Sequence, residues 1–324
     1  MNTVTYAVNA AGPRLVYICS AARSGSTVTD MFLGGHPAAA SLGEINFLGK
    51  AIRLGQDCTC GVEVRDCPNW RKVFDLLQND TGIDLLARPY GLRLWDARAV
   101  HVIDYAYQTR TRLVTIFLRK AWMEARDRLP APLRRHCTIP PAFDVALANK
   151  MRLTEAIARC WNKTIVLDSS KNAREAVELY RLWPDKVRVI LLTRDGRGVY
   201  LSQRKSARSR AESVRGWLHY YRRAMPRLEK HVATEALFRL RYEDLASGPE
   251  ETGRNLCRFM GVDFDPILLE LARGERHMVA GNDTRFAAQK WIRLDERWRS
   301  ELVGDELAFF ERMGGEMNRR LGYN

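Results

Sequence analysis

The sequence predicts an α/β fold, in which a P-loop-like parallel sheet is flanked by helices on both faces and interrupted by a helical insertion. Four short apolar runs bounded by polar loops have the composition of buried strands. Each run is followed by a segment with helical spacing of its apolar residues, an order typical of parallel strands joined by helices. The predicted strands are residues 14–20, 164–170, 188–194 and 236–242.

The strand pattern disappears between about residues 70 and 162. The run from residue 98 to 129 instead carries apolar residues every three or four positions, and the Pro-rich stretch 128–143 ends it. We therefore expect one domain, 1–324, that contains a helical insertion at 70–162.

Charge and composition narrow the class of ligand. The formal net charge is +14, and 42 of the 52 basic residues are Arg. Guanidinium groups donate in pairs to phosphate or sulfate, so phosphorylated ligands, nucleic acid and acidic membranes all fit. An Arg-rich solvated surface is the alternative, and composition alone leaves it open.

We expect a cytoplasmic protein without a membrane span. The first 20 residues lack the basic and apolar regions of a signal peptide, and no later run approaches the roughly 20 apolar residues that a span needs. The seven cysteines form an odd set without a regular framework, which suits a reducing compartment.

The loop "SAARSGST" follows the first predicted strand and leads into a helix. Ligands of open α/β sheets bind at the carboxyl ends of strands, and a helix start offers free backbone N–H groups to an anion. Ser24, Ser26 and Thr27 add hydroxyl donors. The loop lacks the second Gly and the Lys of G-x-x-x-x-G-K-[ST], which disfavours a kinase-like nucleotide enzyme. A Ser-capped turn without a ligand is the other interpretation.

A second segment, "LLTRDGRGVYLSQRK", ends another strand with Arg194 and places Ser202 two turns into the next helix. A guanidinium and a hydroxyl can converge there on one anion. Two anion sites at two strand ends indicate a ligand with two separated phosphates.

These segments resemble those of sulfotransferases that use 3′-phosphoadenosine-5′-phosphosulfate (PAPS), in particular bacterial members and the carbohydrate or heparan type. "RSGST" is similar to the family's 5′-phosphosulfate loop, and "RDGRGVYLSQRK" to its 3′-phosphate segment. "RYEDLASGPEETGRNLCRFMGVDF" and the terminal "RLGY" extend the resemblance. It covers the chain from about residue 14 to the end, apart from the insertion.

The resemblance implies a set of donor-binding residues, with adenosine 3′,5′-bisphosphate as the product. The 5′ loop would wrap the phosphosulfate, Arg194 and Ser202 would hold the 3′-phosphate, and Tyr242 would lie beside the adenine. The T-R-x-x-x-x-x-W pattern near the C-terminus suggests that Arg285 or Lys290 completes the 3′-phosphate site. The residues expected around the 5′-phosphosulfate are Arg23, Ser24, Gly25, Ser26, Thr27 and Val28. Cytosolic members often have an adenine-stacking Trp where this chain has Val28.

The resemblance also implies the catalytic groups. Cytosolic members use a His where "SSKNA" has Lys171, but "GEINFL" resembles the heparan-type stretch whose Glu is the base. We therefore expect Glu44 to be the base, with Lys171 and Arg23 stabilising charge on the transferring group. A first-turn role for Glu44, and Lys171 as the base, stay open. Asp168 and Ser170 either orient Lys171 or form a buried structural pair.

We expect no metal in the reaction, because a singly charged sulfuryl group can be stabilised by Arg23, Lys171 and loop N–H groups without Mg²⁺. Cys58, Cys60 and Cys67 lie close in sequence but supply only three thiols, so a loop over the acceptor site is favoured over structural zinc. No partner pattern marks His36 or His277, which are expected to be structural.

The expected acceptor is a hydroxyl of a sugar, a glycosylated molecule or a lipidic small molecule, bound in a pocket shaped by the insertion. Two other classes of protein are alternatives, a kinase-like nucleotide enzyme and a basic nucleic-acid-binding protein. The second is disfavoured because the aromatic residues have helical core spacing rather than forming a surface stripe. We expect no nucleic-acid partner, and the oligomeric state is open.

Overall fold

The computed structural model describes residues 12–94, 109–129, 133, 137, 141–206, 208–271, 273–287 and 290–324. Its centre is a five-stranded sheet in the order β2-β3-β1-β4-β5, and all neighbouring strands are parallel. The strands are β1 (Arg14–Cys19), β2 (Ala39–Ser41), β3 (Ile165–Asp168), β4 (Val187–Thr193) and β5 (Leu237–Arg241). The predicted α/β class with a parallel sheet is confirmed.

The four predicted strands form within one or two residues of their expected ends, and β2 is the strand that the sequence did not indicate. It has only three residues, Ala39–Ser41, and none of them is β-branched or aromatic. Pairing with β3, from Ala39 opposite Ile165 to Ser41 opposite Leu167, makes it a strand. Tertiary contact thus supplied what local propensity lacked.

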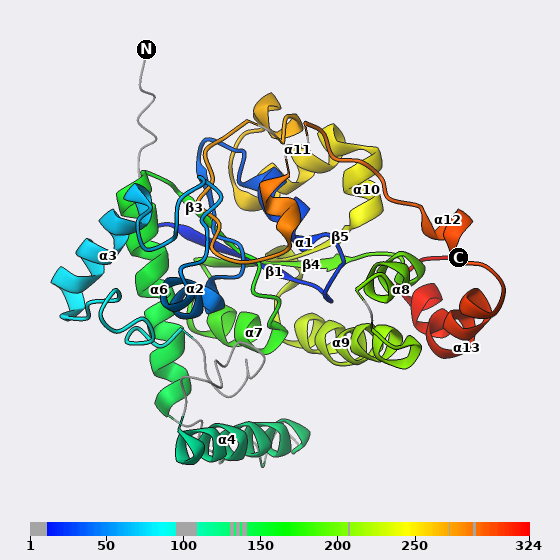
Figure 1. Cartoon of the computed structure of the whole chain (residues 1–324), viewed down its shortest axis with the longest axis horizontal. Coiled ribbons are helices and arrows are strands. Elements are labelled where there is room, and N and C mark those ends of the chain that lie inside the picture. The colour runs from blue at the N-terminus through cyan, green and yellow to red at the C-terminus, as the bar shows by residue number, and fades with distance from the viewer. Residues whose placement is uncertain are drawn as a thin grey trace.

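Helices cover both faces of the sheet, as Figure 1 shows. The face with Val16 and Ile18 of β1 packs against α1 (Ser26–Leu33), α10 (Tyr242–Ser247) and α11 (Pro249–Met260). The alternate residues Leu15 and Tyr17 face the other layer, because successive strand side chains point to opposite sides. That layer contains α6 (Pro141–Trp161), α7 (Ala173–Leu182) and α9 (Arg210–His231).

The described part of the region predicted as a helical insertion is mostly helical, but residues 82–94 form turns and irregular backbone. α3 (Pro68–Thr81) packs on α6, and α6 in turn contacts β2 and β3. α4 (Arg110–Arg128) lies beyond α7, away from the sheet (Figure 1). Residues 95–108 of this region are outside the described part of the chain.

The remaining helices contribute buried residues to the same core cluster as α6, α7 and α9. They are α2 (Leu48–Leu54), α8 (Gly196–Arg204), α12 (Trp298–Glu301) and α13 (Gly304–Arg320), with short 3₁₀ turns η1 (Ile45–Phe47), η4 (Thr234–Ala236), η5 (Pro266–Leu269) and η6 (Asp283–Phe286). Within the described residues, none of the helices combines the length and apolar character needed to cross a membrane.

Candidate active site

A cavity of about 760 Å³ opens at the carboxyl ends of the strands. Five basic and three acidic side chains line it, which leaves an excess of two positive charges. Ten of the residues predicted from sequence line this cavity: Arg23, Gly25, Ser26, Thr27, Val28, Glu44, Lys171, Arg194, Ser202 and Tyr242. Segments more than 200 residues apart in sequence therefore meet at one place.

The loop after β1 presents backbone donors to the cavity. Gly25 is the N-cap of α1, and no side chain caps the helix there. The first intrahelical bond runs from the Thr29 N–H to the Gly25 carbonyl at 2.9 Å, so the earlier N–H groups of the first turn have no partner within the helix. The positive end of the helix dipole adds to their attraction for an anion.

Close packing with Tyr242 explains the glycine in this loop. Gly25 has a φ of 94°, and a Cβ there would lie 2.7 Å from Cδ2 of the Tyr242 ring. A larger residue would be strained in its backbone and would displace the ring. Arg23 also has a positive φ, 69°, which is unusual for a residue with a side chain.

The predicted 3′-phosphate residues contact the 5′ loop directly. Arg23 Nε donates to Ser202 Oγ at 2.9 Å, and Arg194 Nη1 donates to the Arg23 carbonyl at 3.2 Å. The Arg194 guanidinium lies over the ring of Tyr242, 4.6 Å from its centroid. The ends of β1 and β4 are thereby joined into one cationic surface.

Asp295 and Arg297, which no sequence pattern indicated, border this surface. Asp295 accepts from Arg194 at 3.0 Å and from Arg297 at 2.7 and 2.9 Å. Hydrogen bonds from Arg297 and Arg194 hold the pKa of the Asp295 carboxyl well below its usual range. A smaller cavity of about 210 Å³ lies beside these groups and is also lined by Lys205.

Glu44 and Lys171, which also line the main cavity, form an ion pair. Lys171 Nζ lies 2.5 Å from Glu44 Oε1, and the two side chains are 17% and 18% exposed. Lys171 follows β3 with a φ of 64°, and Gly43 turns the chain before Glu44 with a φ of 71°. The Glu44 N–H donates to the Ala280 carbonyl at 3.2 Å. The two side chains predicted to be catalytic therefore contact each other directly.

A buried network of hydrogen bonds and ion pairs joins the chain segments next to this pair, at Asn46 and Asp168. Lys150 Nζ lies 2.6 Å from Asp168 and 3.0 Å from Glu175, and it donates to Asn46 Oδ1 at 2.7 Å. Burial lowers the pKa of Lys150. Attraction by the two carboxylates outweighs this effect and raises the pKa above its ordinary value. The partner of Asp168 is thus Lys150, and Lys171 bonds to Glu44. The Ser170 N–H donates to Asp168 Oδ1 at 2.8 Å, which is compatible with the buried structural pair, and the role of these two residues stays a prediction.

Asp30 of α1 holds the turn that carries Glu44. It accepts hydrogen bonds from the hydroxyls of Ser41 at 2.6 Å and Ser169 at 2.7 Å and from the N–H of Gly43 at 3.0 Å. Burial raises the pKa of Asp30 to about 7, and the bonds from the two serines limit the rise.

Comparison with known proteins decides the family. A sequence profile described as "Sulfotransferase family" matches residues 13–266. The chain belongs to the sulfotransferase family. Among solved structures it is similar to the sulfotransferase domain of the Synechococcus PCC 7002 olefin synthase, with 21% identity and a TM-score of 0.54 over 97% of this chain and 96% of that one.

A second solved structure is the sulfotransferase domain from the curacin biosynthetic pathway, with 19% identity and a TM-score of 0.50 over 96% of this chain and 98% of that one. At these identities the two structures support the fold of the sulfotransferase. A search of curated protein sequences found no match.

Three predicted donor residues of this sulfotransferase lie off the cavity wall. Ser24 is buried, and its hydroxyl lies 3.3 Å from that of Tyr221. Arg285 donates to the Gly281 carbonyl at 2.8 Å, and the Lys290 ammonium lies 5.1 Å from the centroid of the Trp291 ring. Roles for these three in donor binding stay predictions.

The cysteines of the sulfotransferase have a neighbour that sequence did not reveal. Cys58, Cys60 and Cys67 lie with His277, and their ligand atoms are all within 4.8 Å of one another. His277 lies 210 residues after Cys67, so no sequence spacing linked it to the cysteines. Its expected structural role stays a prediction. These four residues could hold a metal ion.

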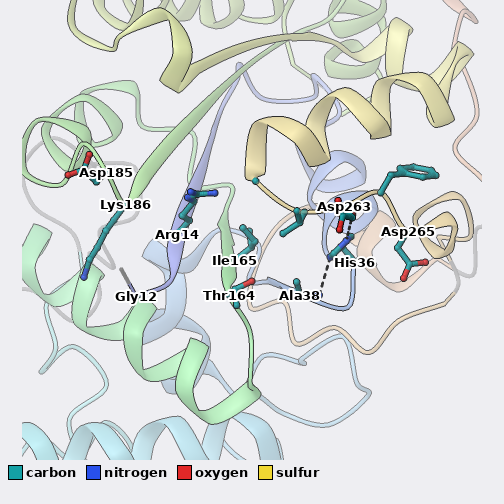
Figure 2. A pocket seen from close by; sticks show the side chains of 13 residues that line it. Gly12, Arg14, His36, Ala38, Thr164, Ile165, Asp185, Lys186, Asp263 and Asp265 are labelled. Atoms are coloured by element: carbon teal, nitrogen blue, oxygen red, sulfur yellow. Dashed lines mark hydrogen bonds between the residues drawn. The ribbon is translucent and has the colours of Figure 1, made fainter. Parts of the chain in front are cut away.

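His36 lies beside a separate cavity of about 370 Å³ at the opposite, amino ends of the strands (Figure 2). Its Nε2 donates to the Asp263 carbonyl at 2.9 Å, and its Nδ1 accepts from the Ala38 N–H at 3.0 Å. Both ring nitrogens thus tie backbone segments together. This cavity shares no lining residue with the main one.

Proposed function

We propose that this sulfotransferase transfers a sulfuryl group from PAPS to a hydroxyl acceptor. One observation carries the proposal: two clusters of basic and hydrogen-bond donor groups, at the ends of β1 and β4, line a single cavity of about 760 Å³. The donor carries its charge in two places, the 5′-phosphosulfate and the 3′-phosphate, and so matches a site with two clusters.

The proposed donor position assigns the N–H groups of the α1 start and Arg23 to the phosphosulfate. Arg194 and Ser202 take the 3′-phosphate, and Tyr242 lies between the two clusters and offers its ring to the adenine. The stacking of Arg194 on Tyr242 supports this position, because it places the guanidinium between the ring and the small cavity near Asp295. Arg297 is a further candidate for the 3′-phosphate.

In the proposed reaction the acceptor oxygen attacks the sulfur in line with the bond to the bridging oxygen. That S–O bond breaks as the new one forms, Glu44 takes the acceptor proton, and adenosine 3′,5′-bisphosphate leaves with the bridging oxygen. Lys171 and Arg23 stabilise the charge that develops on the sulfonate and the leaving oxygen. The Lys171 to Glu44 contact supports the assignment, since it places a fixed cation beside the base.

We infer that the transfer step itself needs no Mg²⁺. The sulfuryl group carries one negative charge, and the cavity already presents five basic side chains to it and to the rest of the donor. A Mg²⁺ titration of the purified enzyme tests this inference, and a rate that rises in proportion to bound Mg²⁺ would contradict it.

The proposed acceptor is a small molecule with a hydroxyl, such as a sugar, a glycosylated product or a lipidic compound. We place its entry near Glu44, where Gly281, Asn282 and Thr284 form the neighbouring wall of the cavity. A contribution from the 70–162 insertion is part of the proposal. The enzyme is further proposed to be bacterial and cytoplasmic, so that it works in the compartment where PAPS is made.

Two measurements test the proposed function. The protein should be retained on immobilised adenosine 3′,5′-bisphosphate and eluted by that ligand but not by ATP or DNA, which separates it from a kinase-like or nucleic-acid-binding protein. Labelled sulfate from PAPS should then appear in hydroxyl compounds of cell extracts. Elution by ATP, or capture by DNA with no bisphosphate binding, would refute the proposal.

A further inference from the structure

We propose that Cys58, Cys60, Cys67 and His277 bind a structural Zn²⁺ ion. The four side chains come from the loop after α2, from the residue before α3 and from a distant C-terminal segment. Their ligand atoms lie within 4.8 Å of one another, and three of the four residues are buried.

The spacing of the ligand atoms fits tetrahedral zinc. With Zn–S bonds of about 2.3 Å, two sulfurs of a tetrahedron are separated by about 3.8 Å, and a sulfur and a nitrogen by slightly less. Here Cys60 Sγ lies 3.6 Å from Cys67 Sγ. His277 Nδ1 lies 3.3 Å from Cys67 Sγ and 3.6 Å from Cys58 Sγ. Only small side-chain movements are needed to place all four around one ion.

The backbone positions the thiols before any ion binds. Cys58 N–H donates to the Val62 carbonyl at 2.8 Å, and Gly61, with a φ of 93°, closes this tight turn so that Cys58 and Cys60 face the same side. Cys67 is the N-cap residue of α3, with Pro68 following it. The helix dipole favours a thiolate at that position.

Hydrogen bonds to other groups orient His277 so that its Nδ1 faces the thiols. Its Nε2 lies 3.0 Å from a Glu275 carboxylate oxygen, which can accept the N–H, and Asn69 Nδ2 donates to the same carboxylate oxygen at 3.0 Å. The Trp70 indole donates to the His277 carbonyl at 3.0 Å. A histidine that donates its other N–H to a carboxylate is the usual support of a zinc-bound imidazole.

The donor set selects the metal and its role. Three thiolates and one imidazole in a tetrahedron favour Zn²⁺ over Mg²⁺ or Ca²⁺, which prefer oxygen. Four protein ligands leave no open position for water or substrate, so the ion would be structural and take no part in sulfuryl transfer.

The position of the cluster predicts what the ion stabilises. His277 begins a segment that runs along the donor cavity: Val279 N–H donates to the Leu42 carbonyl at 2.9 Å, and Ala280 accepts from the Glu44 N–H at 3.2 Å. Farther along, the Asn282 N–H donates to Thr27 Oγ1 at 3.3 Å. Zinc would tie the loop at 56–67 to the segment that borders both Glu44 and the 5′ loop.

The first test measures metal in the full-length, tag-free protein purified without chelator. We expect about one zinc per chain by plasma mass spectrometry, released when the thiols are titrated with a mercurial. Protein prepared with Co²⁺ should show the visible d–d bands of tetrahedral cobalt and a thiolate charge-transfer band. Less than about 0.2 zinc per chain, together with no cobalt spectrum, would overturn the proposal.

Matched variants locate the site. Cys60→Ser, at the exposed ligand, should lower zinc retention during dialysis against a mild chelator by at least tenfold, while Cys160→Ser, which lies outside the cluster, should keep it. Cys67→Ser and His277→Ala should behave like Cys60→Ser where they fold. Equal retention by the Cys60 and Cys160 variants would refute the site.

A disulfide is the competing chemistry for these cysteines. Thiol titration of the unfolded, metal-free protein should count seven free thiols. Finding five in protein without zinc, with Cys60 joined to Cys67, would replace the proposed metal site by a disulfide. None of these readouts depends on sulfuryl transfer, so their failure is separate from failure of the proposed function.

Discussion

Lys171 Nζ lies 2.5 Å from Glu44 Oε1, although the two residues are 127 positions apart in the sequence. Each is held by a turn with a positive φ, at Lys171 itself and at Gly43 before Glu44. The proposed base and the proposed cation therefore form one unit. Substitutions of the two should be strongly non-additive, because removal of either leaves the other without its partner.

Glu44→Gln tests the base. Glutamine keeps the shape of the side chain but loses its basicity, so turnover should fall by roughly 10²- to 10⁴-fold while the affinity for adenosine 3′,5′-bisphosphate stays within about threefold. The acidic limb of the pH–rate profile should disappear as well. Near-normal turnover would show that the base lies elsewhere, and Lys171→Ala compared at high pH would then examine the next candidate.

Arg194→Ala tests the 3′-phosphate site. Loss of a charge-assisted hydrogen bond should weaken binding of adenosine 3′,5′-bisphosphate by about 1.5 to 3 kcal/mol, and calorimetry can measure this. Binding of adenosine 5′-phosphate, which lacks the 3′ group, is the control and should hardly change. Equal losses for the two ligands would mean that Arg194 supports the fold and not the phosphate.

The strand ends and their loops could be predicted from sequence because each proposed anion-binding cluster is built largely from one continuous segment. Residues 23–28 and Arg194 with Ser202 carry their signal in local spacing. Lys150 and His277 carried none, since their partners come from distant elements, and the contact of Asp295 with Arg194 likewise joins distant segments. Burial of Lys150 depends on two carboxylates brought in by β3 and α7, which no local pattern encodes.

Asp295→Asn tests whether the negative charge of the Asp295 carboxylate repels the 3′-phosphate of the donor. Asp295 bonds to Arg194 and Arg297, so its charge lies next to the proposed 3′-phosphate position. Neutralising it should tighten binding of adenosine 3′,5′-bisphosphate by about three- to tenfold at low salt, and less at high salt. Glu296→Gln, on the same cavity wall, is the matched control. Weaker binding by Asp295→Asn would instead assign Asp295 to holding Arg194 in place.

Asp30 gives a prediction for the pH dependence of stability. Its pKa in the folded protein is about 7, raised by burial, whereas an Asp in an unfolded chain has a pKa of about 3.9. Between these values the native state binds more protons than the unfolded state, so this group makes the free energy of unfolding fall as pH rises from about 4 to 7. Above pH 7 it causes no further change.

Asp30→Asn removes the titration and should remove this contribution. Asparagine also alters the bonds to Ser41, Ser169 and Gly43, but that cost is independent of the ionisation of residue 30. The difference in unfolding free energy, wild type minus variant, should therefore fall by up to about 1.4 kcal/mol per pH unit between pH 4 and 7. Urea unfolding at several pH values measures it, with Asp80→Asn, at an exposed position near the end of α3, as the control. A difference that stays constant across this range would show that the Asp30 carboxyl is ionised throughout, held by its three donors despite its burial.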